Sequence, residues 1–357
     1  APLLVFFLVI SSLCNAGKSH GGVIKTVIIL YMFSTVLAAV IAVFASMAFP
    51  VKMTLANAAT DTSAPQGIVE VLNNLLLNVV ANPVSSLVNA NYVGILMWAV
   101  LLGLAFRAAD KMTKKVLADV ADGISMVVTW IINLAPFGIF GLVFNTVSTN
   151  GLDIFTTYGK LLLLLVGCML FIYFVTNPLL VYWCIRQNPY PLIFQCLKRS
   201  ALTAFFTRSS AANIPVNMKV CEEMGLDRDT YSVTIPLGAT INMDGAAITI
   251  TVMTMATAFT LGIHVDIPTA IILSLLAALS ACGASGVAGG SLLLIPMACS
   301  LFGISDDISM QVVAVGFIIG VVQDSVETAL NSSSDLLLSA SAEFRQWRLE
   351  GKEIKFK

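Results

Sequence analysis

The sequence predicts an all-α polytopic membrane protein built from inverted repeats, and three observations lead to that fold class. First, the chain of 357 residues is 58% hydrophobic and only 11% charged, whereas charged residues make up roughly a quarter of a soluble domain. Second, apolar stretches of about 20 residues, long enough to span a bilayer, recur along the chain. Third, two of the long apolar stretches are interrupted near their middles by small and polar residues.

The spanning segments follow from hydropathy and length. The chain opens inside an apolar run and without a methionine, so we expect one more helix upstream of it. Residues 343–357 are expected to form a charged tail. Helices are expected over residues 1–14, 21–49, 68–106 with a break, 119–147, 158–185, 229–262 and 308–342, and the two interrupted stretches cover 190–221 and 268–303.

Basic residues set the orientation of the chain in the membrane. Alternate loops of the predicted topology lie on the same side of the membrane. Of the 19 lysines and arginines, 16 fall in the loops and the tail on one side, and the exceptions are Lys52, Lys160 and Arg208. Loops rich in lysine and arginine lie on the cytoplasmic side of membrane proteins. The tail from Glu343 is therefore expected in the cytoplasm, and the polar stretch 50–67 is expected to be an external loop.

The two interrupted stretches predict re-entrant helical hairpins. Residues 190–221 have basic groups at both ends, whereas residues 268–303 are flanked at both ends by acidic residues. Neither stretch is therefore expected to cross the membrane, and the two enter it from opposite faces. Their middles, 207–212 and 283–290, hold the small and polar residues. A spanning helix with acidic and amide side chains follows each hairpin, which is typical of an inverted repeat.

Five ionisable residues fall within the predicted membrane segments, where each costs about 3 kcal/mol and indicates a functional site. They are Arg208, Asp244, Asp324, Glu327 and Asp335. Because four of them are acidic, the cluster must become protonated, gain water or take up cations, and oxygen ligands favour hard cations, with Na⁺ or H⁺ as the natural candidates. Seven cysteines without a CxxC pair and two histidines argue against a zinc site. The sequence contains no stripe of basic residues, so we do not expect a nucleic-acid partner.

A polar stripe runs along the last predicted helix. Asp324, Thr328, Asn331 and Asp335 follow one another at steps of four, three and four residues, which places them on one helix face, and Glu327 flanks them. The stripe offers an anion for an ammonium group, a hydroxyl and an amide for a carboxylate, and a second anion for a cation. The alternative is a polar seam between two packed helices.

A second polar motif, at residues 242–245, lies in the middle of the segment 229–262. On a regular helix Asn242 and Asp244 point about 200° apart, so they share one site only if the helix unwinds, and Pro236 favours such a break. Backbone carbonyls freed at a break are good Na⁺ ligands. The alternative is a kinked helix whose carboxylate is satisfied.

Together these motifs resemble the dicarboxylate/amino acid:cation symporters, the glutamate-transporter-like family, over nearly the whole chain. The residues that carry the likeness are Thr207–Ser210, Asn242–Gly245, the glycine-rich stretch 283–290, and Asp324, Asn331 and Asp335. The stretches 206–218 and 323–333 are similar to a bacterial subgroup that takes up serine and threonine with sodium. The resemblance therefore implies an importer in the bacterial cytoplasmic (inner) membrane, with Na⁺ as the coupling ion.

The resemblance also implies an architecture. Residues 1–14 and 68–147, with the upstream helix, would form the scaffold of a homotrimer. Residues 21–49 and 158–342 would form a transport domain that carries a small amino acid across the bilayer by an elevator motion. The second hairpin would act as its gate.

Site residues are carried over by position. Asp324 is similar to the family's binder of the substrate ammonium, and Asn331 to the binder of its carboxylate. The other expected substrate-binding residues are Thr328, Glu327, Arg208, Ser209, Ser210, Gly286 and Val287. Three Na⁺ sites are implied, the first by Gly238, Asn242, Asn331 and Asp335, the second by Thr240, Ala281, Cys282 and Ala284, and the third by Tyr31, Ser34, Thr35, Asn242 and Asp244. On their own, the three residues of segment 21–49 indicate only hydrogen bonds between helices.

Glu327 departs from the family pattern, because members that carry acidic substrates have an arginine at this position. A glutamate repels a second carboxylate in low-dielectric surroundings and accepts a hydrogen bond from a hydroxyl. Charge alone therefore favours a small neutral substrate such as serine or threonine. Arg208, the remaining cation, is expected to pair with Asp324 or Glu327.

Other functions remain open at this point. Within the same class, the chain could couple Na⁺ or H⁺ to another small neutral amino acid or to a dicarboxylate. From different classes, an intramembrane hydrolase or a channel could use the same carboxylates. The sequence contains no nucleophile–base pair, so we do not expect an enzyme.

Overall fold

The structure is a computed structural model, and its described residues form helices joined by turns and loops, with no β-strand among them. Four described helical spans are long and apolar enough to cross a membrane: Gly22–Ala48, Tyr158–Ile185, Arg228–Thr260 and Asp306–Leu349. The prediction of an all-α membrane protein is therefore confirmed. The described residues are 2–15, 22–55, 77, 80–89, 91–133, 153–282 and 289–354.

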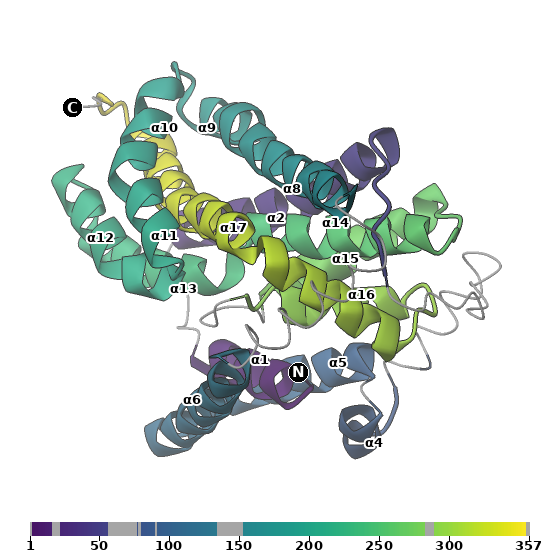
Figure 1. The fold of residues 1–357 in the computed structure, drawn as a ribbon. Helices are drawn as coiled ribbons and strands as arrows, with labels where there is room; N and C mark the ends of the chain where they lie inside the picture. The colour runs from purple at the N-terminus through teal and green to yellow at the C-terminus, as the bar shows by residue number, and fades with distance from the viewer. Residues whose placement is uncertain are drawn as a thin grey trace.

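One group of helices lies to one side of the others in Figure 1. Helix α1 packs against α5 and α6, and α4 packs against α5. Asparagine caps start two of these helices, since Asn82 and Asn91 accept backbone N–H bonds at the beginning of α4 and α5. The members of this group are α1 (Pro2–Asn15), α4 (Pro83–Val88), α5 (Tyr92–Ala105), the short 3₁₀ helix Phe106–Ala108, and α6 (Lys111–Asn133).

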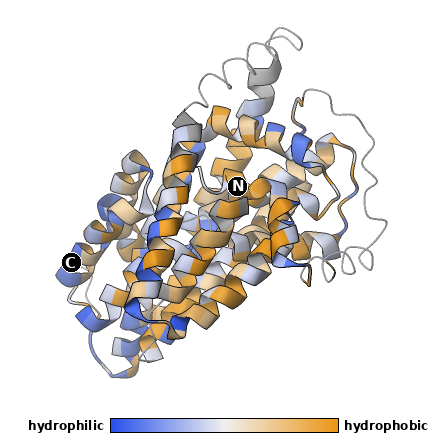
Figure 2. Ribbon diagram, turned by 90° about the horizontal axis from the view of Figure 1, so that it is seen from below, coloured by the Kyte–Doolittle hydropathy of each residue, from blue (hydrophilic) through white to orange (hydrophobic). Residues whose placement is uncertain are grey.

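The second group surrounds the long helix α17 (Asp306–Leu349), drawn from green to yellow through the middle of Figure 1. Helix α17 packs against α2, α8, α9, α11, α12, α13, α14 and α16. The other members are α2 (Gly22–Ala48), α8 (Asp153–Phe171), α9 (Asn177–Ile185), α10 (Tyr190–Cys196), α11 (Leu202–Thr207), α12 (Ser210–Glu223), α13 (Arg228–Ile241), α14 (Asp244–Thr260), α15 (Ile267–Ala281) and α16 (Ile295–Ser300). Hydrophobic residues dominate these helices, and hydrophilic ones gather near the C-terminal end (Figure 2).

Several helices of the second group are locally interrupted. A π-helical turn, Ile172–Thr176, joins α8 to α9, and another, Leu197–Ala201, joins α10 to α11. Such turns are frequent near functional sites. Arg208 adopts a left-handed conformation, with φ of 50°, between α11 and α12. The chain therefore reverses at the centre of the first predicted hairpin, and α11 packs against α12.

Two predicted helix boundaries are wrong. Helix α6 begins at Lys111 rather than at residue 119, because Asp110 caps it by accepting the Thr113 N–H at 2.8 Å. Helix α17 does not end at residue 342 but continues to Leu349. Glu343 is buried there and accepts the Asp227 N–H at 2.6 Å. The first part of the expected tail is therefore packed helix.

Candidate functional site

The break between α13 and α14 is the centre of the candidate site. Asn242 and Met243 lie between the two helices with φ of −97° and −117° and positive ψ, outside the helical region. The unwinding predicted from the motif at residues 242–245 is therefore confirmed. It allows Asp244 to face α2 while Asn242 faces α17, so one short segment supplies both sides of the site.

Asp244 is buried and held by two hydroxyl groups of α2. Ser34 Oγ donates to Asp244 Oδ2 at 2.8 Å, and Thr35 Oγ1 lies 3.1 Å from Oδ1. Tyr31, one turn earlier, instead donates to the backbone carbonyl of Asp335 at 2.9 Å. The structure thus brings together the residues expected for the third cation site, with Tyr31 linking them to α17.

Asp335 packs against the same break. Asn242 Nδ2 donates to Asp335 Oδ1 at 2.9 Å, and it lies 3.5 Å from the Asn331 carbonyl oxygen. A methyl group at Gly238 would lie 2.8 Å from both Asp335 Oδ1 and the Tyr31 hydroxyl oxygen. Glycine at this position therefore leaves room for the Asp335 carboxylate and the Tyr31 hydroxyl group to lie against α13. The residues expected for the first cation site meet here.

The oxygens around the break have the composition of a sodium site. Asn242 Oδ1 is buried without a hydrogen-bond partner among the described residues, although buried acceptors normally have one. Asp244 and Asp335 are both buried, and no described lysine or arginine forms a salt bridge with either. Two uncompensated carboxylates and a free amide oxygen fit a hard cation such as Na⁺. Its ligands would come from Asn242, Asp244, Asp335 and the α2 hydroxyls.

The second expected cation site is only partly described. Thr240 Oγ1 donates to the Leu237 carbonyl of its own helix at 2.7 Å. Cys282 Sγ lies 3.6 Å from the Ile241 carbonyl oxygen, and Ala281 beside it is buried. The end of α15 therefore lies next to the break. Ala284, Gly286 and Val287 lie outside the described residues.

Asn331 connects the break to the polar face of α17. Its Oδ1 accepts the Gly245 N–H at 2.7 Å, and its Nδ2 lies 3.5 Å from Met243 Sδ. Thioether sulfur is a weak acceptor. The Asn331 amide N–H₂ is therefore available to a stronger acceptor such as the carboxylate of a substrate.

Asp324 lies near the turn between α11 and α12, further toward the start of α17. The Arg208 guanidinium is 4.0 Å from its carboxylate, so the structure pairs Arg208 with Asp324 rather than with Glu327. Ser209 caps α12 by accepting the Ala212 N–H at 3.2 Å, and Ser210 is the first residue of that helix. Thr328, one turn after Asp324, is buried. The long ion-pair distance leaves Asp324 open to another cation, such as an ammonium group.

Glu327 is buried and clamped by three neutral donors. Its Oε2 accepts hydrogen bonds from Thr249 Oγ1 at 2.7 Å, Ser291 Oγ at 2.9 Å and Gln323 Nε2 at 2.5 Å. No described hydrogen bond reaches its other oxygen, Oε1. A methyl group at Gly245 would lie 2.9 Å from Glu327 Cα, so α14 meets α17 closely here. Glu327 therefore has one oxygen fixed and one oxygen open to a donor.

Sequence reasoning missed the three donors of this clamp. Gln323 precedes Glu327 by four residues, so helical spacing could have paired them. Thr249 and Ser291 are distant in sequence from Glu327 and carried no signal. Hydroxyl groups in apolar segments are common and usually bond their own helix, which is why neither stood out.

A second missed cluster joins the first predicted hairpin to α17. Asn213 Nδ2 donates to Ser332 Oγ at 2.8 Å, and Asn217 Nδ2 to the Ser332 carbonyl at 2.8 Å. Asn213 also lies 3.0 Å from Ser200 Oγ on the preceding arm. The spacing of two asparagines by four residues was the available signal. This cluster fixes α12 beside the site residues of α17.

The whole chain can now be compared with known proteins. Residues 1–343 match the model of the sodium:dicarboxylate symporter family. The chain belongs to this family. A relative, the serine/threonine transporter SstT of Bifidobacterium adolescentis, is 59% identical over 355 residues, which cover 99% of this chain and 83% of the relative. Membership in the sodium:dicarboxylate symporter family makes the chain a membrane transporter rather than an enzyme, so an intramembrane hydrolase is set aside.

Proposed function

We propose that this symporter imports serine and threonine together with Na⁺. The observation that carries the substrate assignment is Glu327, a buried carboxylate whose Oε2 is held by three neutral donors. An acidic side chain brought to this place would meet a like charge in a low-dielectric site. A hydroxyl group would instead donate to the open Oε1. The 59% identity to the serine/threonine transporter SstT supports the same substrates.

The remaining groups suit the two ends of an amino acid. The substrate ammonium replaces the Arg208 guanidinium, whose ion pair with Asp324 is long, at 4.0 Å. The substrate carboxylate accepts from the Asn331 amide, assisted by Ser209, Ser210 and the tip of the second hairpin. Na⁺ neutralises Asp244 and Asp335 at the break, so substrate and cation bind to the same polar face of α17.

The proposal includes the architecture implied by the family resemblance. The helix group α1, α4, α5 and α6 acts as the scaffold of a homotrimer, and the group around α17 moves as an elevator. The segments 190–221 and 268–303 are re-entrant hairpins. The protein lies in the bacterial inner membrane with its C-terminus in the cytoplasm. The separate packing of the two helix groups supports this division.

Uptake into proteoliposomes tests the function. Purified protein is reconstituted, and entry of labelled serine is followed under an inward Na⁺ gradient, with an equal K⁺ gradient as control. We expect uptake that depends on Na⁺, that unlabelled threonine suppresses, and that excess aspartate leaves unchanged. Serine uptake that is indifferent to Na⁺, or strong competition by aspartate, would contradict the proposal.

A further inference from the structure

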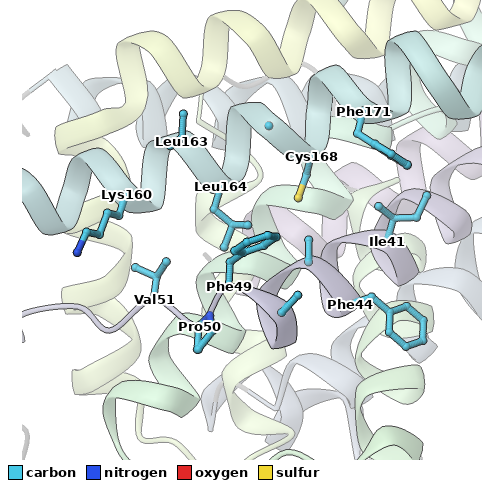
Figure 3. A pocket seen from close by; sticks show the side chains of 13 residues that line it. Ile41, Phe44, Phe49, Pro50, Val51, Lys160, Leu163, Leu164, Cys168 and Phe171 are labelled. Atoms are coloured by element: carbon cyan, nitrogen blue, oxygen red, sulfur yellow. The ribbon is translucent and has the colours of Figure 1, made fainter.

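An apolar groove lies between α2 and α8, away from the candidate transport site. Its volume is about 950 Å³, near the top of the roughly 300–1,000 Å³ range of small-molecule sites. One wall comes from residues 41–51 at the end of α2, and the other from residues 160–171 of α8. Figure 3 shows Phe44, Phe49, Leu164 and Phe171 among the side chains that line it. Both walls belong to helices long and apolar enough to span the membrane.

The residues that line the groove indicate what kind of ligand it can bind. Lys160 is the one charged residue of the lining, and the other lining residues are apolar. Lys160 is exposed and forms no salt bridge with any described residue. A polar metabolite would find no partners along such walls. A ligand that fits has a long apolar body and a single anionic end.

The length of the groove matches half of a bilayer. Lys160 lies at one end and Phe171 at the other (Figure 3). Eleven residues of helix rise about 16 Å, and one leaflet contributes about 15 Å to the hydrocarbon core. Lys160 also stands two residues after the start of the span Tyr158–Ile185, where a lysine reaches the lipid headgroups. The groove therefore runs from headgroup level to the middle of the membrane.

Gly167 keeps the groove open. Small residues on spanning helices usually let two backbones approach closely, but a methyl group built on Gly167 meets no atom within 4 Å. Gly167 lies in the lining, with Ala45 and Ala48 also in it from α2. Here the small residues do not bring the two helices into close contact but leave an open space between them. A ligand from outside the chain can therefore occupy that space.

We propose that this groove is a binding site for one anionic phospholipid of the surrounding bilayer. Its acyl chain lies between α2 and α8, and its phosphate contacts the Lys160 ammonium group. Bilayer lipid is the one apolar ligand with an anionic end that surrounds a spanning helix at high concentration. The attraction of a lysine near the membrane surface to anionic lipid is about 1 kcal/mol, which corresponds to a preference of roughly five-fold.

One wall of the groove, α2, also carries candidate cation ligands. Helix α2 supplies Ser34 and Thr35, and Asn177, at the start of α9, accepts from Ser34 Oγ at 3.5 Å. A lipid that fills the groove therefore stabilises the position of α2, the helix whose hydroxyl groups hold Asp244. Because ligand binding stabilises the folded state, anionic lipid should raise the unfolding temperature of the protein.

Native mass spectrometry of the full-length chain measures the binding. The protein is released from nanodiscs containing equal amounts of phosphatidylglycerol and phosphatidylcholine with identical acyl chains, and retained lipid is counted. The variants are Lys160→Gln and Gly167→Leu. Their matched controls are Lys52→Gln, an exposed lysine outside the lining, and Gly159→Leu, a glycine with equally open space that does not line the groove.

We expect the wild type and both controls to retain phosphatidylglycerol about five-fold over phosphatidylcholine. Lys160→Gln should retain the two lipids equally, and Gly167→Leu should retain neither. Thermal unfolding in lipid-free detergent should be alike for all five proteins, which shows that Gly167→Leu is folded. Equal retention of the two lipids by the wild type, or undiminished retention by Gly167→Leu, would overturn the proposal, as would selective retention of free fatty acid.

Discussion

The two ends of the polar face of α17 differ in how their carboxylates are satisfied. Around Glu327 every described donor is a neutral side chain, and the Arg208 guanidinium stands 4.0 Å from Asp324, one turn earlier on the helix. Around Asp335 the partners are other oxygen-rich groups of the α13–α14 break, and Asn242 Oδ1 has no partner among the described residues. The Glu327 end can therefore accept hydrogen bonds from a substrate, and the Asp335 end can bind a dehydrated cation.

The different surroundings of Glu327 and Asp335 explain how one helix can bind both a substrate and a cation. Successive turns of α17 meet different neighbours, with α14 and the turn before α16 at Glu327, and α2 and α13 at Asp335. The chemistry of each carboxylate is therefore set by the helix packed against it rather than by its own type. Variants at the two ends should have separable effects.

The largest effect is expected for Asp335→Asn. This change removes one of two buried anions of the cation end and keeps the shape of the side chain. Mutation of a residue that only supports a metal ligand typically costs about 10–100-fold in affinity. Loss of a carboxylate ligand should cost at least as much, so the Na⁺ concentration for half-maximal serine uptake should rise by at least about ten-fold. Uptake at several Na⁺ concentrations measures it. The control is Ser341→Ala, which removes a buried hydroxyl group whose described hydrogen bond is to the Leu337 carbonyl of its own helix. An unchanged Na⁺ dependence in Asp335→Asn would contradict the proposed difference between the two ends.

Gly238→Ala should be the next most damaging change. The added methyl group would lie 2.8 Å from Asp335 Oδ1, so the buried Asp335 side chain, or the helix that carries it, must shift. Overpacking of this kind costs about 1–3 kcal/mol of unfolding free energy. Thermal unfolding in detergent should show a lower midpoint and a smaller stabilisation by Na⁺.

Gly320→Ala is the matched control, because a methyl group there meets nothing within 4 Å. It should leave stability unchanged or raise it by about 0.5–1 kcal/mol, since alanine favours a helix interior over glycine. Equal unfolding midpoints for the two variants would show that the close approach at Gly238 is not needed.

Glu327→Gln tests the opposite end. A hydrogen bond from a substrate hydroxyl to a carboxylate is stronger than one to an amide by about 1.4 kcal/mol, which is about ten-fold in affinity. The preference for serine over alanine should therefore fall about ten-fold. The ratio of the two uptake rates at saturating Na⁺ measures this. A preserved ratio would remove Glu327 from side-chain recognition.

The smallest effect is expected for Ser291→Ala. It removes one of three donors to Glu327 Oε2, at 2.9 Å, and leaves the other two. A hydrogen bond to a charged group contributes about 1.5–3 kcal/mol, but Ser291 acts on the substrate only through the position of Glu327. The serine-to-alanine ratio should therefore fall by several-fold at most. Ser300→Ala, whose hydroxyl bonds the Met297 carbonyl of its own helix, should leave the ratio unchanged. Identical ratios in the two variants would show that the clamp does not set specificity.

Much of the fold was predictable, because a bilayer demands helices of a nearly fixed length and apolar composition. Helix ends were less predictable, since a local cap at Asp110 and a distant bond from Asp227 to Glu343 decided them. The break at Asn242 was predictable from the requirement that it and Asp244 serve one site.

The candidate site was predictable where its residues share one helix. The stripe from Asp324 to Asp335 follows from helical period alone. The Glu327 clamp was not predictable, because Thr249 and Ser291 reach it from separate segments. Nor does any spacing in the sequence indicate that Asn242 Oδ1 lacks a hydrogen-bond partner among the described residues.

The separation of the two ends is tested most directly by one crossed measurement. The Na⁺ concentration for half-maximal uptake and the serine-to-alanine ratio are determined in Asp335→Asn and Glu327→Gln, side by side in the same proteoliposomes. We expect Asp335→Asn to raise the Na⁺ requirement at an unchanged substrate ratio, and Glu327→Gln to lower the ratio with little change in the Na⁺ requirement. If each variant shifts both quantities equally, the two ends form a single site and the separation of roles is wrong.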